Sequence, residues 1–349
     1  MNDVALLPAR ERAEIFQETA ARKSVSSVVA MEKDFWVCWM LARVFDPPLV
    51  NGMVFKGGTS LSKVYGAIDR FSEDVDLSLP REAFGFSGDH DLQPGISRSK
   101  RDVLLTEMRD ACEAHVSGRL VDDLRERVGA ALESAPASDV WSVDVDDADA
   151  ATLLFAYPAA LSSESYGAGG YIRPVIRLEF GGRNEVWPAE AHSVQPYCLE
   201  VFPDLSTTPS VSVNVLAGER TFWEKVTLIH AEFHRPETSR RPERVSRHYS
   251  DLARLTRHDI GTRALEQLDL LRAVASHKAA YFPSKWARYD ETTSGSLHLA
   301  PHESLERELR SDYAAMREMF FQEPESFEDM LAELRRLESR INTLTVQAG

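Results

Sequence analysis

The sequence predicts an α/β protein with a mostly helical carboxyl-terminal part, and three observations lead to this class. Short apolar runs and alternating segments typical of strands fall between helical segments up to about residue 215. A glycine turn joins one of these runs directly to a helix. From about residue 216 onward, helical spacing dominates. We therefore expect an α/β domain over residues 1–215 and a helical domain over residues 216–349.

The first elements expected are two helices between Pro8 and Phe45, because apolar residues recur there at helical spacing up to a pair of prolines. Residues 53–55 form a short apolar run, which predicts a strand. The turn Lys56 to Ser60 follows, and apolar residues at helical spacing continue from there to Ile68. The local order is therefore strand, glycine turn, helix.

A second strand is expected at residues 74–79, where Asp74 and Asp76 alternate with apolar residues. Successive side chains of a strand point to opposite faces, so both aspartates lie on one face. The remaining elements expected before residue 216 are helices over about Arg98 to Glu133, two strands between Val140 and Tyr157 that meet at an acidic turn, and strands over Tyr171–Phe180 and Val211–Val215.

Composition narrows the function classes. The 349 residues suit about two domains, and 40 basic against 55 acidic side chains give a net charge of −15. This charge excludes a nucleic-acid binder that works through a globally positive surface. No stretch approaches the length of a membrane span, and no secretory leader is recognisable. The three cysteines, Cys38, Cys112 and Cys198, are distant from each other and fit small core residues in a reducing cytoplasm.

The glycine turn and the aspartate pair together indicate a chemistry. Glycines let the backbone approach an anion closely, and a helix start directs unpaired N–H groups at it. Two carboxylates on one strand face suit Mg²⁺ or Mn²⁺, which prefer oxygen ligands and often share them with substrate phosphates. The turn lacks the spacing of a Walker P-loop. These features predict metal-assisted phosphoryl or nucleotidyl transfer.

Two blocks resemble a known family. Residues 55–63, FKGGTSLSK, and residues 70–78, RFSEDVDLS, are similar to the signature of the AbiEii/AbiGii nucleotidyltransferase-toxin family, which includes the MenT-type toxins. That family is a branch of the polymerase β-like nucleotidyltransferase superfamily. The resemblance extends to EKDFW at residues 32–36, to residues 175–179, to the helix of Lys225, to RHYSDL at residues 247–252 and to the last helix.

The resemblance implies roles for particular residues. Asp74 and Asp76 are expected to bind the metal ions, with Glu179 as a third carboxylate. An acidic turn with Asp144, Asp146, Asp147 and Asp149 is the alternative source of that ligand. Lys225 is expected to neutralise triphosphate charge, and Asp251 to act as a general base or to orient Lys225. The residues expected to hold the nucleotide are Lys56, Gly57, Gly58, Thr59, Ser60 and Arg247.

The resemblance also implies a biological role. The protein is expected to be the cytoplasmic toxin of a bacterial toxin–antitoxin or phage-defence pair, with an antitoxin encoded by a neighbouring gene. It would transfer NMP from an NTP to RNA, with the 3′ end of tRNA as the expected acceptor. Ser72 is a candidate for silencing by phosphorylation, or a structural serine. The alternatives are transfer to a small molecule or a protein hydroxyl, and a non-catalytic module that binds NTP or a partner.

A locally basic segment between residues 233 and 257 is the candidate contact for RNA or triphosphate. An ordinary solvated loop is an equally good interpretation. His234 and His248 flank the segment, and we expect ordinary surface or core histidines because no other zinc ligands are near in the sequence. The arginines of the segment are Arg235, Arg240, Arg241, Arg244, Arg247, Arg254 and Arg257.

Overall fold

The computed structural model describes residues 1–25, 27–72, 74–93, 95–136, 140–166, 173–239, 241–242, 244–293 and 295–347. The chain divides into two compact units. The first unit contains Met1–Val64 and Phe71–Val215, and the second contains Tyr65–Arg70 and Leu216–Gly349. The fold class is mixed α/β, as the sequence predicts. A short segment that precedes the aspartate pair in sequence therefore clusters with the carboxyl-terminal helices.

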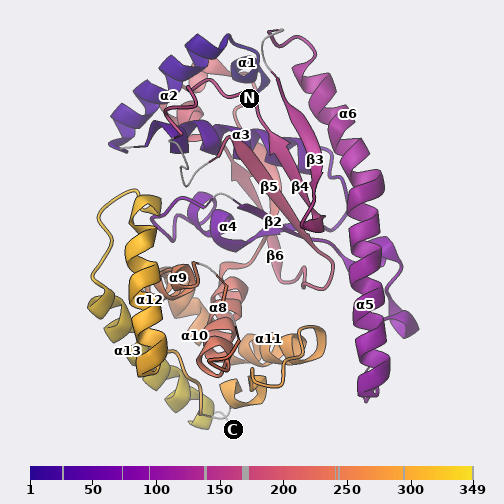
Figure 1. Ribbon diagram of the computed structural model, residues 1–349, viewed down its shortest axis with the longest axis vertical. Helices are drawn as coiled ribbons and strands as arrows, with labels where there is room; N and C mark the ends of the chain where they lie inside the picture. The colour runs from indigo at the N-terminus through magenta and orange to yellow at the C-terminus, as the bar shows by residue number, and fades with distance from the viewer. Residues whose placement is uncertain are drawn as a thin grey trace. The chain divides into compact units, whose positions relative to one another are not determined.

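The described residues contain one seven-stranded sheet in the order β3-β4-β5-β2-β1-β7-β6 (Figure 1). The strands are β1 Val54–Lys56, β2 Asp74–Ser78, β3 Ser142–Asp146, β4 Asp149–Ala156, β5 Val175–Gly181, β6 Ala189–Val194 and β7 Val211–Leu216. Strand β2 pairs antiparallel with β1 and parallel with β5. The sheet is therefore mixed, and β2 lies near its centre.

The helices of the first unit surround this sheet. They are α1 Asn2–Ala5, α2 Ala9–Lys23, α3 Val28–Phe45, α4 Gly57–Lys63, α5 Arg98–His115, α6 Val121–Leu132 and α7 Tyr197–Val201. A π-helical turn at Val116–Leu120 joins α5 to α6, and short 3-10 turns lie at Arg81–Phe84, Gly88–His90 and Pro203–Leu205. Figure 1 shows α5 and α6 as one long helical run beside the β3 and β4 side of the sheet.

Helix α3 supplies much of the core of the first unit. Ser27 caps its amino end, where its hydroxyl accepts a hydrogen bond from the N–H of Ala30 at 3.1 Å. Trp36 and Trp39 are fully buried and stack on Tyr157 and Phe155 at the end of β4, with ring centroids 5.6 and 5.7 Å apart. Almost every residue of α3 is buried, including Glu32, Lys33 and Asp34, so the helix is enclosed by protein rather than lying on the surface.

The second unit is helical, as the sequence predicts. Its elements are α8 Gly218–Phe233, α9 Ser246–Arg257, α10 Asp259–Leu265, α11 Leu268–Tyr281, a 3-10 turn η5 at Tyr289–Thr293, α12 Glu303–Ala315, a second 3-10 turn at Met316–Met319 and α13 Phe327–Gln347. Helix α8 contacts α9, α10 and α11, and α9 contacts α12 and α13. Tyr65–Arg70 joins this unit through a backbone bridge between Arg70 and Phe320.

Most of the sequence-based expectations for the elements are confirmed. The two helices before Pro47, the strand–turn–helix order, the alternating aspartate strand and the β3–β4 hairpin all occur. All three cysteines are buried and free, as expected. The expected strand at Tyr171–Phe180 is present as β5, although Tyr171 and Ile172 lie outside the described residues.

One expectation was wrong, and one strand was not expected. The helix after the glycine turn ends at Lys63 instead of continuing to Ile68, because the following residues leave the first unit. The sequence also gave no indication of β6, which lies at the end of the sheet and is mostly exposed. An edge strand of small and polar residues lacks the apolar alternation that identifies a strand.

Among the described residues, no helix is long and apolar enough to cross a membrane.

Candidate active site

The glycine turn and the aspartate strand meet at one point of the first unit. Strand register places Lys56 opposite Asp76, so the next residue, Gly57, starts α4 directly beside the Asp76 side chain. Gly57 has a φ of +78°, and a Cβ built on it would lie 1.9 Å from Oδ2 of Asp76. Only glycine fits this position, since a side chain would displace the carboxylate and the positive φ disfavours other residues.

The hydroxyl groups of the glycine turn bind backbone carbonyls. Thr59 is buried, and its hydroxyl donates to the carbonyls of Asp74 and of Ser72, the latter at 3.2 Å. Ser60 is fully buried, and its hydroxyl donates to the carbonyl of Gly57 at 2.9 Å. The Thr59 hydrogen bonds fasten α4 to the start of β2, whereas the Ser60 bond lies within α4. A phosphate at this turn would therefore meet backbone N–H groups rather than the Thr59 and Ser60 hydroxyls.

Three carboxylates converge on the polar face of β2 and β5. Asp76 lies opposite Glu179 in the parallel pair, and Asp74 lies opposite Arg177. Burial raises the pKa of Glu179 to about 7, and the negative charges of Asp74 and Asp76 add to the rise. A divalent cation would relieve this repulsion, and the oxygen-only donor set fits Mg²⁺ or Mn²⁺.

Arg177 supplies the cation that the structure places among these carboxylates. Its Nε lies 3.4 Å from Glu179 and 3.8 Å from Asp74, and its Nη1 lies 2.6 Å from Asp146. The Arg177 guanidinium thus contacts two of the three carboxylates and the neighbouring Asp146. A metal ion would take over the charge balance that Arg177 now provides.

The two candidate sources of the third carboxylate now differ in their surroundings. Glu179 lies opposite Asp76 across the strand pair. In the acidic turn, Asp146 binds Arg177 and caps the N–H of Ala148 at 3.0 Å, while Asp149 accepts a hydrogen bond from Thr152. Asp146 and Asp149 therefore already have partners, most of them within the hairpin itself. The geometry therefore favours Glu179.

Residues of the EKDFW block on α3 hold the elements around the site in place. Asp34 of α3 forms a buried ion pair with Lys63 of α4 at 2.7 Å, and it also accepts a hydrogen bond from the N–H of Tyr197. Glu32 accepts hydrogen bonds from the N–H of Ala160 and the hydroxyl of Tyr166 at 2.5 and 2.6 Å. Both acids are buried, so they hold α4 and a loop in place instead of contacting a substrate.

A second cluster lies in the second unit, around Asp251 of α9. Arg70 binds both oxygens of Asp251 with two hydrogen bonds of 2.7 Å, and Lys225 of α8 donates to Oδ2 at 2.8 Å. All three side chains are buried. The direct contact between Lys225 and Asp251 supports the expectation that the two residues act together. Arg70 is a third member that the sequence did not identify.

The charges of this cluster decide between the two roles considered for Asp251. Burial alone would raise the pKa of Asp251, but Arg70 and Lys225 outweigh it and hold the pKa well below its ordinary range. Such a carboxylate is a weak base, so the geometry favours an orienting role. Burial lowers the pKa of Lys225, and the positive charges of Arg70 and Arg247 act in the same direction against the opposing effect of Asp251. Two cations on one anion leave an excess positive charge, which suits a phosphate.

His248 lies close to this cluster. Its Nδ1 is buried with no hydrogen-bond partner, and burial, with the charges of Lys225 and Arg247 nearby, lowers its pKa well below the ordinary value. A neutral imidazole therefore stands beside Lys225. These neighbours could not be predicted from the sequence, because they depend on the packing of α9 against α8.

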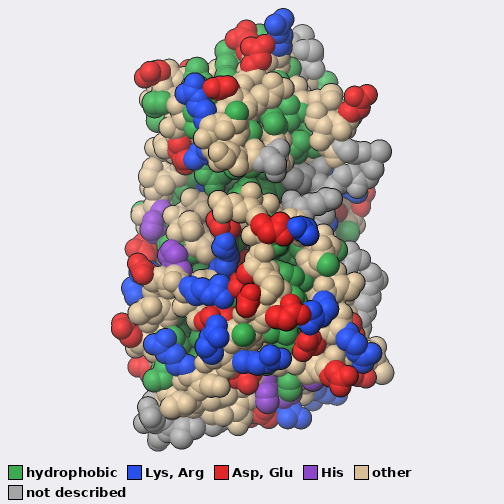
Figure 2. Space-filling view, turned by 90° about the vertical axis from the view of Figure 1, so that its left-hand side faces the viewer, with side chains coloured by type: hydrophobic (Ala, Val, Ile, Leu, Met, Phe, Trp, Pro, Cys, Tyr) green, Lys and Arg blue, Asp and Glu red, His purple; other side chains and the backbone are tan. Residues whose placement is uncertain are grey.

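Acidic partners neutralise much of the basic segment. Arg235 pairs with Glu232, Arg241 with Glu308, Arg254 with Asp69, and Arg257 with Glu325. Arg240 lies outside the described residues. Figure 2 shows acidic and basic side chains side by side over the helices of the second unit. The acidic partners of these four arginines therefore offset much of the positive charge that the segment has in the sequence.

The expected site residues thus fall into two groups. The first unit brings together Gly57, Asp74, Asp76 and Glu179 and adds Arg177. The second unit brings together Lys225, Asp251 and Arg247 and adds Arg70 and His248. Arg70 is the first residue of the RFSEDVDLS block, but nothing in that block indicates that its partner is Asp251. Arg177 could have been found, because it precedes Glu179 on the same strand face.

Comparison with known proteins identifies a family. A family model described as nucleotidyl transferase AbiEii toxin, type IV toxin–antitoxin system, matches residues 39–333, which is most of the chain. No curated protein matches at a significant level. The match includes the glycine turn, the three carboxylates and the Lys225–Asp251 pair.

Replacement of Gly57 by alanine should abolish most activity. The new Cβ would push the Asp76 carboxylate away, and displacement of a reacting group by about 1 Å costs on the order of 100-fold in rate. Gly85→Ala is the control, since Gly85 also has a positive φ, +96°, but no atom lies within 4 Å of its ideal Cβ. Nucleotide incorporation would be measured for both variants. Equal activities would show that the close approach to Asp76 is unimportant.

The Asp251 cluster predicts unequal effects of two substitutions on stability. Asp251→Asn leaves Arg70 and Lys225 buried without their carboxylate and should lower the free energy of unfolding by about 3–5 kcal/mol. Lys225→Met keeps the Arg70–Asp251 pair intact and should cost less than about 2 kcal/mol. Urea unfolding followed by circular dichroism measures both. An equal loss in the two variants would contradict the charge balance described above.

Proposed function

Because the chain belongs to the AbiEii family of nucleotidyl transferase toxins of type IV toxin–antitoxin systems, we propose that it transfers NMP from an NTP to RNA, with the 3′ end of tRNA as the acceptor. The family implies a nucleotide substrate and an antitoxin partner. We place this activity in the cytoplasm, where both RNA and the product of a neighbouring antitoxin gene are present. The observation that carries the proposal is the convergence of Gly57, Asp76 and Glu179.

In the proposed mechanism, Asp74, Asp76 and Glu179 hold Mg²⁺ or Mn²⁺. When bound, such an ion supplies positive charge to the phosphates and lowers the pKa of an acceptor hydroxyl. The raised pKa of Glu179 supports this assignment, because a carboxylate crowded by two others is stabilised in its charged form by a cation. Arg177, which pairs with Asp74 and Glu179, would give up this charge balance to the ion.

The other residues act on the nucleotide. We assign the phosphates to Lys56 and to the backbone of Gly57 and Gly58, since the Thr59 and Ser60 hydroxyls are already bonded to carbonyls. Lys225 offsets negative charge that develops on the triphosphate, and Asp251 fixes the direction of its ammonium group. Arg247 lies close enough to Lys225 to lower its pKa and would add to the same positive field.

One observation favours a second candidate function. The arginines of the basic segment that pair with acids offer little positive surface to an RNA backbone. Transfer of NMP to a small molecule or to a protein hydroxyl would make no such demand. The two candidates share one active site and differ only in the acceptor, so one experiment separates them.

That experiment follows label from NTP into separate acceptors: total tRNA, protein and small molecules. We expect label in tRNA, and we expect Asp76→Asn and Glu179→Gln each to reduce it by at least about 100-fold, as for loss of one charge-stabilising group. Asp144→Asn is the matched control, because Asp144 is an exposed acid of the neighbouring hairpin. Label confined to protein or small molecules would favour the second candidate. Full activity in Asp76→Asn would overturn both.

Ser72 is the proposed point of control by the antitoxin. It is partly exposed, lies two residues before Asp74, and its carbonyl accepts a hydrogen bond from Thr59 of the glycine turn. A phosphate there adds roughly two negative charges beside the carboxylates and would compete with the nucleotide for metal. We expect phosphorylation of Ser72 after coexpression with the neighbouring gene's product, detected by mass spectrometry. An unmodified Ser72 in an inactivated toxin would contradict this route, whereas Ser72→Ala should stay active and escape silencing.

A further inference from the structure

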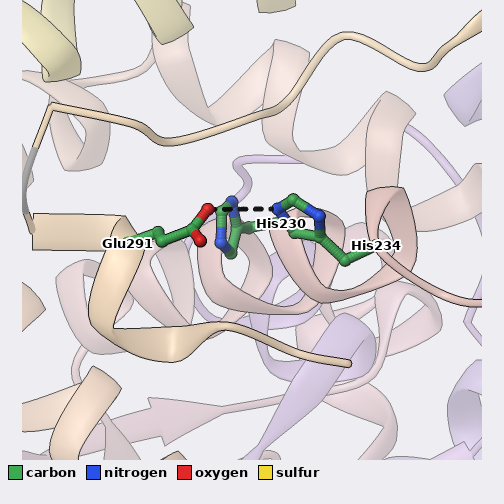
Figure 3. Close-up of side chains that lie close together, drawn as sticks. All are labelled: His230, His234 and Glu291. Atoms are coloured by element: carbon green, nitrogen blue, oxygen red, sulfur yellow. Dashed lines mark ion pairs between the residues drawn. The ribbon is translucent and has the colours of Figure 1, made fainter. Parts of the chain in front are cut away.

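A cluster of histidines and a glutamate lies in the second unit, apart from the residues proposed for nucleotidyl transfer. His230 and His234 occupy successive turns at the end of α8, and η5 brings Glu291 to them (Figure 3). One ligand atom from each of the three residues lies within 4.8 Å of the others. The expectation that no other zinc ligands lie near His234 does not hold, because His230 lies four residues before it on α8 and Glu291, distant in sequence, is close in space.

His234 has an unsatisfied nitrogen that faces this cluster. Its side chain is 10% exposed, and its Nε2 is buried without a hydrogen-bond partner, 3.6 Å from Oε2 of Glu291. Buried polar atoms nearly always have a hydrogen-bond partner, so a buried ring nitrogen without one, beside a carboxylate, indicates a ligand that binds there. The dashed line in Figure 3 joins these two groups, with His230 next to them.

His230 is held firmly in the same place. It is fully buried, its Nε2 lies 3.0 Å from the carbonyl of Arg288, and its Nδ1 accepts a hydrogen bond from the N–H of His298 at 3.0 Å. Hydrogen bonds of this kind to the far nitrogen fix the orientation of metal-binding imidazoles. Whichever nitrogen turns to an ion gives up one of these bonds, which makes binding weaker than at a fully preformed site.

We propose that His230, His234 and Glu291 bind a divalent transition-metal ion, with Zn²⁺ the best fit. Two imidazoles and one carboxylate form a donor set that Zn²⁺ accepts, and water completes its four ligands. Zinc–ligand bonds of about 2.0–2.1 Å place tetrahedral ligands about 3.4 Å apart. His234 and Glu291 are already near that separation, at 3.6 Å. The site is independent of the magnesium site proposed above, since Mg²⁺ prefers oxygen ligands.

The ion would fasten η5 to the end of α8. Glu291 is the most accessible of the three ligands, with 31% of its side chain exposed, so the ion would enter from its side. Arg288 competes for the glutamate, because its Nη1 lies 3.3 Å from Oε1. The Arg288 side chain is 56% exposed and is free of the core, so it moves away from Oε1 at small cost. The ion would therefore link η5 to α8 through three protein ligands, with its fourth position open to water.

Metal titration of the full chain tests the proposal. Tag-free protein is stripped with a chelator and titrated with Zn²⁺ in the presence of excess Mg²⁺ by competition with a chromophoric chelator. A parallel titration with Co²⁺ is read by its visible absorption. We expect one tightly bound equivalent per chain. His234→Asn and Glu291→Gln should each weaken binding by at least about 100-fold, the upper end of the cost of losing an outer partner alone.

The controls separate a real site from adventitious binding. His90→Asn removes an exposed histidine of the first unit and should leave the titration unchanged. Glu291→Gln keeps the size of a partly exposed side chain, so its folding is expected to be normal, and circular dichroism verifies this. Failure of the parent chain to bind one equivalent, or equal binding by the parent and both ligand variants, would overturn the proposal. Nucleotidyl transfer is not the readout, so its absence would not affect the result.

Discussion

The register of β2 with its two neighbours is the constraint on which the candidate active site depends. Pairing with β1 sets Asp76 opposite Lys56, and pairing with β5 sets Asp76 opposite Glu179. A shift of one residue in either pair would turn the aspartates to the other face of the sheet. The absence of a side chain at Gly57 follows from the same register, because α4 begins where β1 ends and meets the carboxylate at once. Backbone pairing thus fixes the glycine turn and the acids together.

Patterns within short stretches of sequence predicted the elements of the candidate active site that depend only on neighbouring residues. The period-two alternation around Asp74 and the strand–glycine–helix order depend on neighbours in sequence, and both occur in the structure. What the sequence could not predict depends on contacts between distant residues. Arg70 binds Asp251 across 181 positions, and the helix predicted to run to Ile68 stops at Lys63 because Tyr65–Arg70 joins the other unit. Spacing carries no signal for such contacts.

The distribution of charge explains how a chain with an excess of acidic side chains can still bind phosphate. Acids pair with several arginines of the basic segment and so offset much of its local positive charge. The cations that matter are the buried ones. Arg70 and Lys225 share one carboxylate, so this buried cluster has a net positive charge that solvent does not screen. Net charge therefore says little about where an anion binds.

Different donor atoms would allow two cation sites to coexist in the chain. Asp74, Asp76 and Glu179 offer only oxygen, whereas His230 and His234 offer imidazole nitrogen beside one carboxylate. Hard cations such as Mg²⁺ bind the first set and are poor competitors for the second. Zn²⁺ and similar ions accept imidazole nitrogen readily. Selection by ligand chemistry, and not by position in the sequence, would keep the two ions apart.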